Sequence, residues 1–147
     1  MSMDAEPEGL LCPSAPPDWL GATVIGIIGG TADTPRVTPL EQPLIVTSEL
    51  LALSEPVLPT EVFRFAAPCS ARTCQHFQDG ACHLAQKIVQ LLPGVDDQLP
   101  FCTIRTNCRW FRQEGRAACY RCSQVVTDNV YPGVAMRLAA DPTYKVG

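Results

Sequence analysis

Cysteine is the residue type whose number and spacing in this chain point to chemistry. Seven of the eight cysteines lie within the 54 residues from Cys69 to Cys122. Their spacing is C-x4-C-x7-C, then nineteen residues, then C-x5-C-x10-C-x2-C. Thiolates bind zinc and iron–sulfur clusters, and thiols can also pair as disulfides. The candidate metal ligands are Cys69, Cys74, Cys82, Cys102, Cys108, Cys119 and Cys122.

The first part of the chain helps to choose between metal and disulfides. Residues 1–19 are acidic and proline-rich, and they lack the basic and apolar regions of a secretory signal. The most apolar run, residues 22–28, is far too short to span a bilayer. We therefore expect a cytoplasmic protein without a membrane span. In that reducing compartment, clustered cysteines are more often metal ligands than disulfides.

The spacing also bears on which metal is bound. Cys119 and Cys122 can bind one metal ion or two irons of one cluster. Structural zinc sites usually carry two such short pairs, and this chain has one. A cubane cluster is larger than an ion and accepts ligands from distant segments. The pattern therefore favours a small iron–sulfur protein with a [4Fe–4S] cluster, and the alternative is a zinc-stabilised protein- or nucleic-acid-interaction module without redox activity.

Charge is distributed unevenly along the chain. Residues 1–61 hold nine acids and one base, whereas residues 62–147 hold ten bases and six acids. The basic half contains the cysteine cluster, and positive charge there would attract an anionic cluster or an acidic partner. The two halves can equally neutralise each other within the fold. Binding of nucleic acid, with arginines on the phosphates and Trp110 as a stacking platform, is the weaker interpretation.

These features favour a non-enzymatic redox or binding protein. Its expected role is electron transfer, redox or gas sensing, or service as a subunit of a larger enzyme, with a protein redox partner. The two histidines, His76 and His83, lie in no recognisable catalytic motif. Seven thiols and one histidine would complete two four-coordinate sites, so a histidine is a possible eighth ligand. Cys12 lies 57 positions before the next cysteine, and we expect it to be a dispensable bystander.

The elements that must position the cysteines form, by prediction, one small α+β domain. Residues 1–18 are expected to be an irregular arm, and residues 19–147 a single domain with a metal-binding region over 69–122. A β-rich half, broken by prolines, packs on a half made of short helices. We expect strands at 22–28, 36–40, 44–47 and 61–66. Helices are expected at 49–54, at 81–92 with Asp79 as N-cap, at 108–114 between Asn107 and Gly115, at 116–127 and at 134–140.

Overall fold

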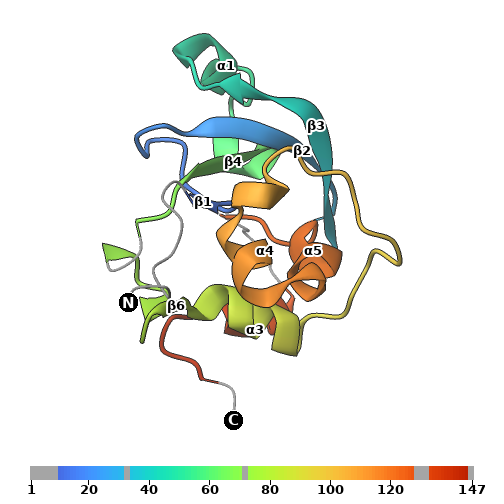
Figure 1. Ribbon diagram of the computed structural model, residues 1–147. Helices are drawn as coiled ribbons and strands as arrows, with labels where there is room; N and C mark the ends of the chain where they lie inside the picture. The colour runs from blue at the N-terminus through green and yellow to red at the C-terminus, as the bar shows by residue number, and fades with distance from the viewer. Residues whose placement is uncertain (1–9, 32–33, 71–72, 128–132, 146–147) are drawn as a thin grey trace.

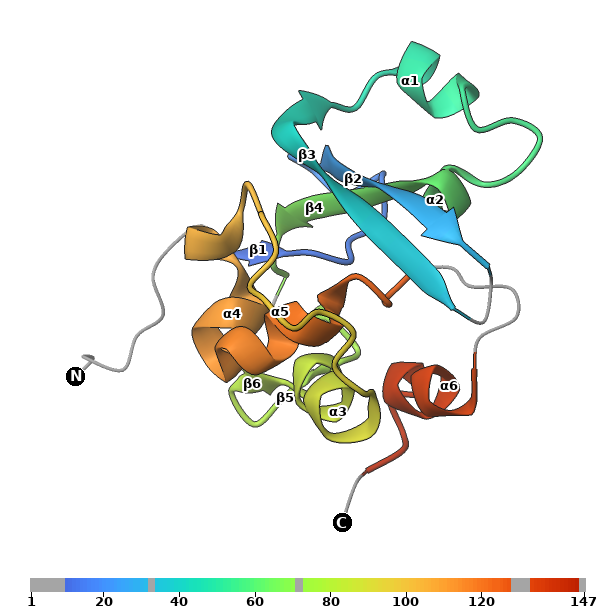
Figure 2. The same cartoon turned by 90° about the vertical axis from the view of Figure 1, so that its right-hand side faces the viewer.

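The computed structural model describes residues 10–31, 34–70, 73–127 and 133–145. An antiparallel sheet covers a layer of short helices, so the α+β prediction is confirmed (Figures 1 and 2). The sheet has the strand order β1-β4-β2-β3. Its strands are β1 (Leu11–Cys12), β2 (Thr23–Gly30), β3 (Pro35–Ile45) and β4 (Phe63–Pro68). A separate two-stranded hairpin is formed by β5 (Phe77–Gln78) and β6 (Ala81–Cys82).

Short helices make up the rest of the domain. Two of them, α1 (Ser48–Ala52) and α2 (Pro59–Val62), connect β3 to β4. The layer beneath the sheet consists of α3 (His83–Leu91), the 3-10 helix η3 (Arg105–Asn107), α4 (Arg109–Glu114), α5 (Arg116–Cys122) and α6 (Val134–Ala140) (Figure 2). Within the described ranges, no helix is both long enough and apolar enough to cross a membrane.

Strand β3 is continuous, although the sequence predicts two separate strands there. Its prolines are tolerated because β3 is an edge strand, whose outer side needs no hydrogen-bonding partner. Pro39 pairs with Gly26, at a bulge in β2. A Cβ atom on Gly26 would come within 2.6 Å of Val37, so only glycine allows this close approach. The backbone N–H of Val37 also donates to the carbonyl of Ser123 at 2.8 Å, which ties the sheet to the end of α5.

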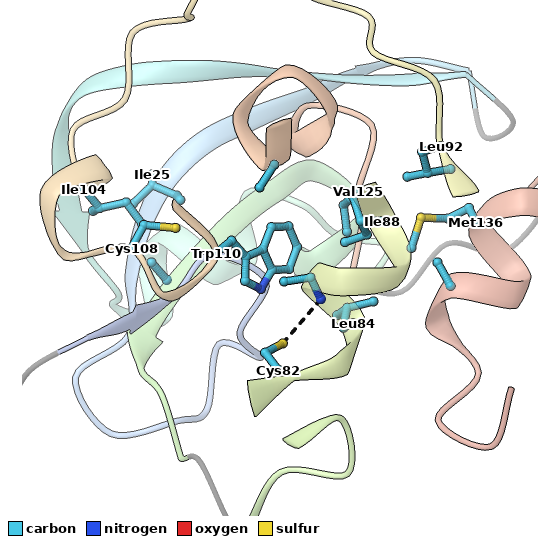
Figure 3. Close-up of a cluster of buried hydrophobic side chains, with 14 residues drawn as sticks. Ile25, Cys82, Leu84, Ile88, Leu92, Ile104, Cys108, Trp110, Val125 and Met136 are labelled. Carbon is cyan, nitrogen blue, oxygen red and sulfur yellow. Dashed lines mark hydrogen bonds between the residues drawn. The ribbon is translucent and has the colours of Figure 1, made fainter. Parts of the chain in front are cut away.

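The main hydrophobic core lies between the sheet and the helices. Its largest fully buried side chains are Trp110, Phe65 and Ile88. Figure 3 shows Trp110 at the centre of this core, with Ile88 of α3 on one side and Cys108 on the other. A smaller cluster of Val24, Phe63 and Phe65 faces α1. The packing therefore places α4, which carries Trp110, directly against the cysteine-bearing elements.

Helix α3 starts later than its pattern predicts. The expected N-cap, Asp79, lies in the turn of the β5–β6 hairpin with φ of +54°. Cys82 is the actual cap, and its Sγ accepts a hydrogen bond from the Ala85 N–H at 3.5 Å. The β5–β6 hairpin pairs Phe77 with Cys82, and this pairing places Asp79 in the turn instead of at the start of the helix. Lys87 of α3 is buried, and its Nζ donates to the carbonyls of Asp141 and Tyr144 near the C-terminal end of the domain.

The later helices match their predictions more closely. Gly115 separates α4 from α5 with φ of +72°, as its position in the sequence predicts. Cys108, instead of Asn107, precedes α4, because Asn107 belongs to η3. Helix α5 ends at Cys122, five residues before the predicted end. Helix α6 has the predicted bounds.

The predicted irregular arm is ordered in its second half. Residues 1–9 lie outside the described ranges. In β1, Leu11 pairs with Pro68 and Cys12 with Ala67 of β4. The arm therefore joins the sheet as an edge strand, and it brings Cys12 to the end of β4.

Candidate metal centre

Four cysteines, which we call the first cysteine set, line one cavity of about 490 Å³. They are Cys12, Cys69, Cys74 and Cys82. The pairing of β1 with β4 continues to Cys69, whose N–H donates to the Leu10 carbonyl at 2.9 Å. Cys74 is held by a turn in which its carbonyl accepts from Phe77 at 3.0 Å, and Cys82 ends β6. One sheet edge and one hairpin thus bring together thiols from distant parts of the chain.

The thiols of the first set lie close enough to influence one another's ionisation. Burial raises the pKa of Cys12 to about 12 and that of Cys82 to about 11. The negative charges of Cys69 and Cys74 contribute to both of these values, and the charge of Cys82 contributes to that of Cys12. The expectation that Cys12 lies apart from the other cysteines is therefore wrong. Its sequence distance is bridged by the β1–β4 pairing.

Helix α4 fixes the backbone at Cys82. The side-chain oxygen of Gln113 accepts from the Cys82 N–H at 2.8 Å, and its side-chain nitrogen donates to the Cys82 carbonyl at 2.8 Å. Arg109, on the same helix, also lines the first cavity and is only 4% exposed. Its guanidinium lies 5.1 Å from the centre of the Phe77 ring. The first set therefore has a positively charged and geometrically fixed wall.

The other four cysteines, which we call the second cysteine set, line a different cavity of about 80 Å³. They are Cys102, Cys108, Cys119 and Cys122. Burial raises the pKa of Cys108 to about 12, and the charges of Cys122 and Cys102 add to the shift. Cys119 and Cys122 lie one turn apart on α5, as their spacing predicts. The structure thus divides the eight cysteines into two sets of four.

Four of the residues that line these cavities carry a buried nitrogen atom without a hydrogen-bond partner among the described residues. Among the described residues, no partner is present for Nη2 of Arg64, Nε of Arg105, Nδ1 of His76 or Nε1 of Trp110. Arg64 and Arg105 line the second cavity, His76 lines the first, and Trp110 lines both. Buried polar atoms are nearly always paired, so each exception calls for an explanation. Water or a bound group inside the cavities would satisfy these atoms.

Arg64 of β4 connects the two sets. It is 3% exposed, and its guanidinium lies 5.6 Å from the centre of the Trp110 ring. Its Nε donates to the carbonyl of Pro13, next to Cys12, and its Nη1 donates to the carbonyl of Cys122, both at 2.6 Å. No carboxylate in the described ranges pairs with it. A buried guanidinium without a counter-ion is costly, and an anionic group in the second cavity would compensate it.

The remaining charged residues fall into different environments. Arg112 and Arg116 are exposed, whereas Arg121 donates to the carbonyls of Leu92 and Ala117. Asp96 pairs with Arg36 at 3.0 Å. Burial, followed by the charge of Lys87, lowers the pKa of His76, so its ring is neutral at pH 7. The arginines between positions 105 and 121 therefore do not form one solvated basic face.

The geometry also bears on which groups the cysteines could bind. Within the described ranges, no three His, Cys, Asp or Glu side chains lie close enough together to hold a single metal ion as they stand. Nor do any two of the eight cysteines, all of which are described, form a disulfide. The seven sequence-predicted ligands do not share one centre, because three of them join Cys12 and four surround the second cavity.

No protein family model, curated protein or solved structure matches this chain.

Proposed function

We propose that this protein is an iron–sulfur protein that carries a [4Fe–4S] cluster on the first cysteine set and transfers single electrons to a protein partner. The observation that carries the proposal is the first cavity itself. Four thiols from the sheet edge and the hairpin line about 490 Å³ of space. A water molecule needs only about 10–15 Å³. The cavity therefore has room for a group of many atoms.

The spread of the thiols favours a cluster over a single ion. Zinc holds four thiolates at about 2.3 Å each, which brings the sulfur atoms into mutual contact. In the described structure, no three members of the first set lie close enough together to form a single-ion site. A cubane distributes its four thiolates over its corners and so accepts a wider arrangement. The sequence spacing, which has only one short cysteine pair, supports the cluster over the zinc alternative.

The unpartnered nitrogens support the same group. The sulfur atoms of an iron–sulfur cluster accept N–H hydrogen bonds, which help to set the reduction potential. Figure 3 shows the indole nitrogen of Trp110 on the side facing Cys82. His76 offers a second buried nitrogen to the same cavity, and Arg109 supplies positive charge there. These residues would hold the cluster in an environment that is largely shielded from water.

Electron transfer is the role that fits this arrangement best. Burial of the thiols and the nearby positive charge of Arg109 suit an electron carrier. The proposal includes a reducing compartment such as the cytoplasm, because all eight cysteines would have to remain reduced to act as ligands. The partner would be a redox protein or a larger enzyme.

The test is the metal content of protein prepared without oxygen. The proposal predicts brown protein with iron and acid-labile sulfide in equal amounts, and an EPR signal after reduction by dithionite. Cys82→Ser should remove the cluster of the first set, whereas the control Ser70→Ala, next to Cys69, should retain it. Colourless protein with zinc and no sulfide would contradict the proposal. Folded protein without any metal would contradict it as well. So would a Cys82→Ser variant whose spectrum is unchanged.

A further inference from the structure

We propose that the second cysteine set holds a second [4Fe–4S] cluster and that the two clusters exchange electrons across Trp110. This inference rests on the proposed function of the first set. It adds a second metal site and a path for the electron inside the domain. Cys102, Cys108, Cys119 and Cys122 provide the four thiolates that such a cluster requires.

The charges around the second cavity match those of a bound cluster. An oxidised [4Fe–4S] core with four thiolates has a net charge of about −2. Two guanidinium groups, those of Arg64 and Arg105, line the cavity, and each has a buried nitrogen without a partner among the described residues. Arginine keeps its charge at every relevant pH. The two arginines would therefore neutralise the cluster and donate hydrogen bonds to its sulfur atoms.

One connection between the two cysteine sets is the side chain of Trp110. Trp110 is 1% exposed and lines both cavities. Figure 3 shows Cys108 of the second set to the left of Trp110 and Cys82 of the first set below it. Arg64 adds a second link, since it donates to the carbonyl of Pro13 beside Cys12 and to that of Cys122. Both side chains on this path are buried, since Trp110 is 1% and Arg64 is 3% exposed.

The exchange is a one-electron step. The cluster that starts as [4Fe–4S]⁺ loses one electron and becomes [4Fe–4S]²⁺, while the other cluster gains that electron and undergoes the reverse change. No bond to a ligand breaks and no proton moves. A one-electron donor protein supplies the first electron in the cell, and dithionite supplies it in the test.

The experiment compares the full chain with variants of each set, all prepared without oxygen. The full chain should contain about eight iron atoms and about eight sulfides. The double variant Cys119→Ser/Cys122→Ser should retain about half of both, and Cys102→Ser serves the same purpose if the double variant does not fold. After full reduction, the full chain should give an EPR signal broadened and split by two neighbouring spins. Each single-cluster variant should give a simple signal.

The outcomes separate this inference from the proposed function. About four irons in the full chain, unchanged by Cys119→Ser/Cys122→Ser, would overturn the second cluster and leave the first intact. Zinc in place of iron in the second set would overturn it as well. About eight irons without spin interaction would overturn the exchange across Trp110. A chain without any iron would overturn the proposed function itself.

Discussion

The side-chain amide of Gln113 makes two hydrogen bonds of 2.8 Å with the backbone of Cys82. Helix α4 begins after Cys108, a member of the second set, and its fifth residue, Gln113, holds a member of the first set. One helix of six residues thus fixes the position of both sets. Its geometry can be tested without any metal.

Gln113→Leu should destabilise the metal-free, reduced protein. The substitution removes both partners of the Cys82 backbone in a partly buried position, and each unsatisfied group costs about 1–3 kcal/mol. Urea unfolding measures the loss. The control is Gln124→Leu, which removes one exposed hydrogen bond to the Pro93 carbonyl and should cost at most about 1 kcal/mol. Equal losses in the two variants would show that the amide of Gln113 does not hold Cys82.

Cys12→Ser should abolish the cluster of the first set. The sequence alone predicts the opposite, because Cys12 lies far from the other cysteines, but the structure places it in the same cavity as Cys69, Cys74 and Cys82. Iron and sulfide analysis of the anaerobic protein measures the effect. Unfolding of the metal-free variant provides the control for a packing role. Full metal content with a lower free energy of unfolding would make Cys12 a packing residue only.

Arg64→Met should make the second cluster harder to reduce. Reduction adds a negative charge, and the buried guanidinium that would stabilise it is lost, so the reduction potential should fall. A redox titration followed by EPR measures the change. The control is Arg116→Met, because Arg116 is exposed and its charge is screened by solvent and salt. A shift of the same size in both variants would mean that the Arg64 charge does not act on the cluster directly.

The metal-free, reduced protein should lose stability in alkali. The folded pKa values of Cys12 and Cys108 are about 12 and that of Cys82 is about 11, whereas an unfolded cysteine titrates near pH ~8.5. Above that pH the unfolded chain releases protons that the folded chain keeps. The free energy of unfolding should therefore be unaffected by these thiols below pH ~8, and fall above it by about 1.4 kcal/mol per pH unit for each thiol.

Urea unfolding between pH ~7 and ~10.5 follows this change. Cys12→Ala should reduce the slope by about a third, since it removes one of the three thiols. A slope that is the same in this variant, or a rise in stability with pH, would contradict the prediction.

Local signals in the sequence account for much of the fold. The bounds of α6 and the break at Gly115 were predictable because each depends on residues within one or two helical turns. The start of α3 was not, because the pairing of Phe77 with Cys82 outweighed the capping preference of Asp79. The continuity of β3 also depends on its neighbour, since only its place at the sheet edge tolerates Pro39.

The site was predictable in its residue types but not in its grouping. The spacing identified seven candidate ligands, and it correctly placed Cys119 and Cys122 on one helix. It could not assign Cys12 to the first set, because strand pairing across 57 positions leaves no periodic signal. Arg64 was missed for a similar reason. It lies in a predicted strand, and only the fold shows that it contacts the carbonyls of Pro13 and Cys122.

The pairing of β1 with β4 has a consequence for how the protein is made. Cys12 leaves the ribosome before Cys82, with which it shares a cavity, and Arg64 leaves before Cys122, whose carbonyl it contacts. A nascent chain therefore exposes thiols of both sets before either cavity can close. Delivery of metal would have to follow translation of almost the whole domain. Until then, the early thiols would depend on the cell's reductants and chaperones to avoid oxidation.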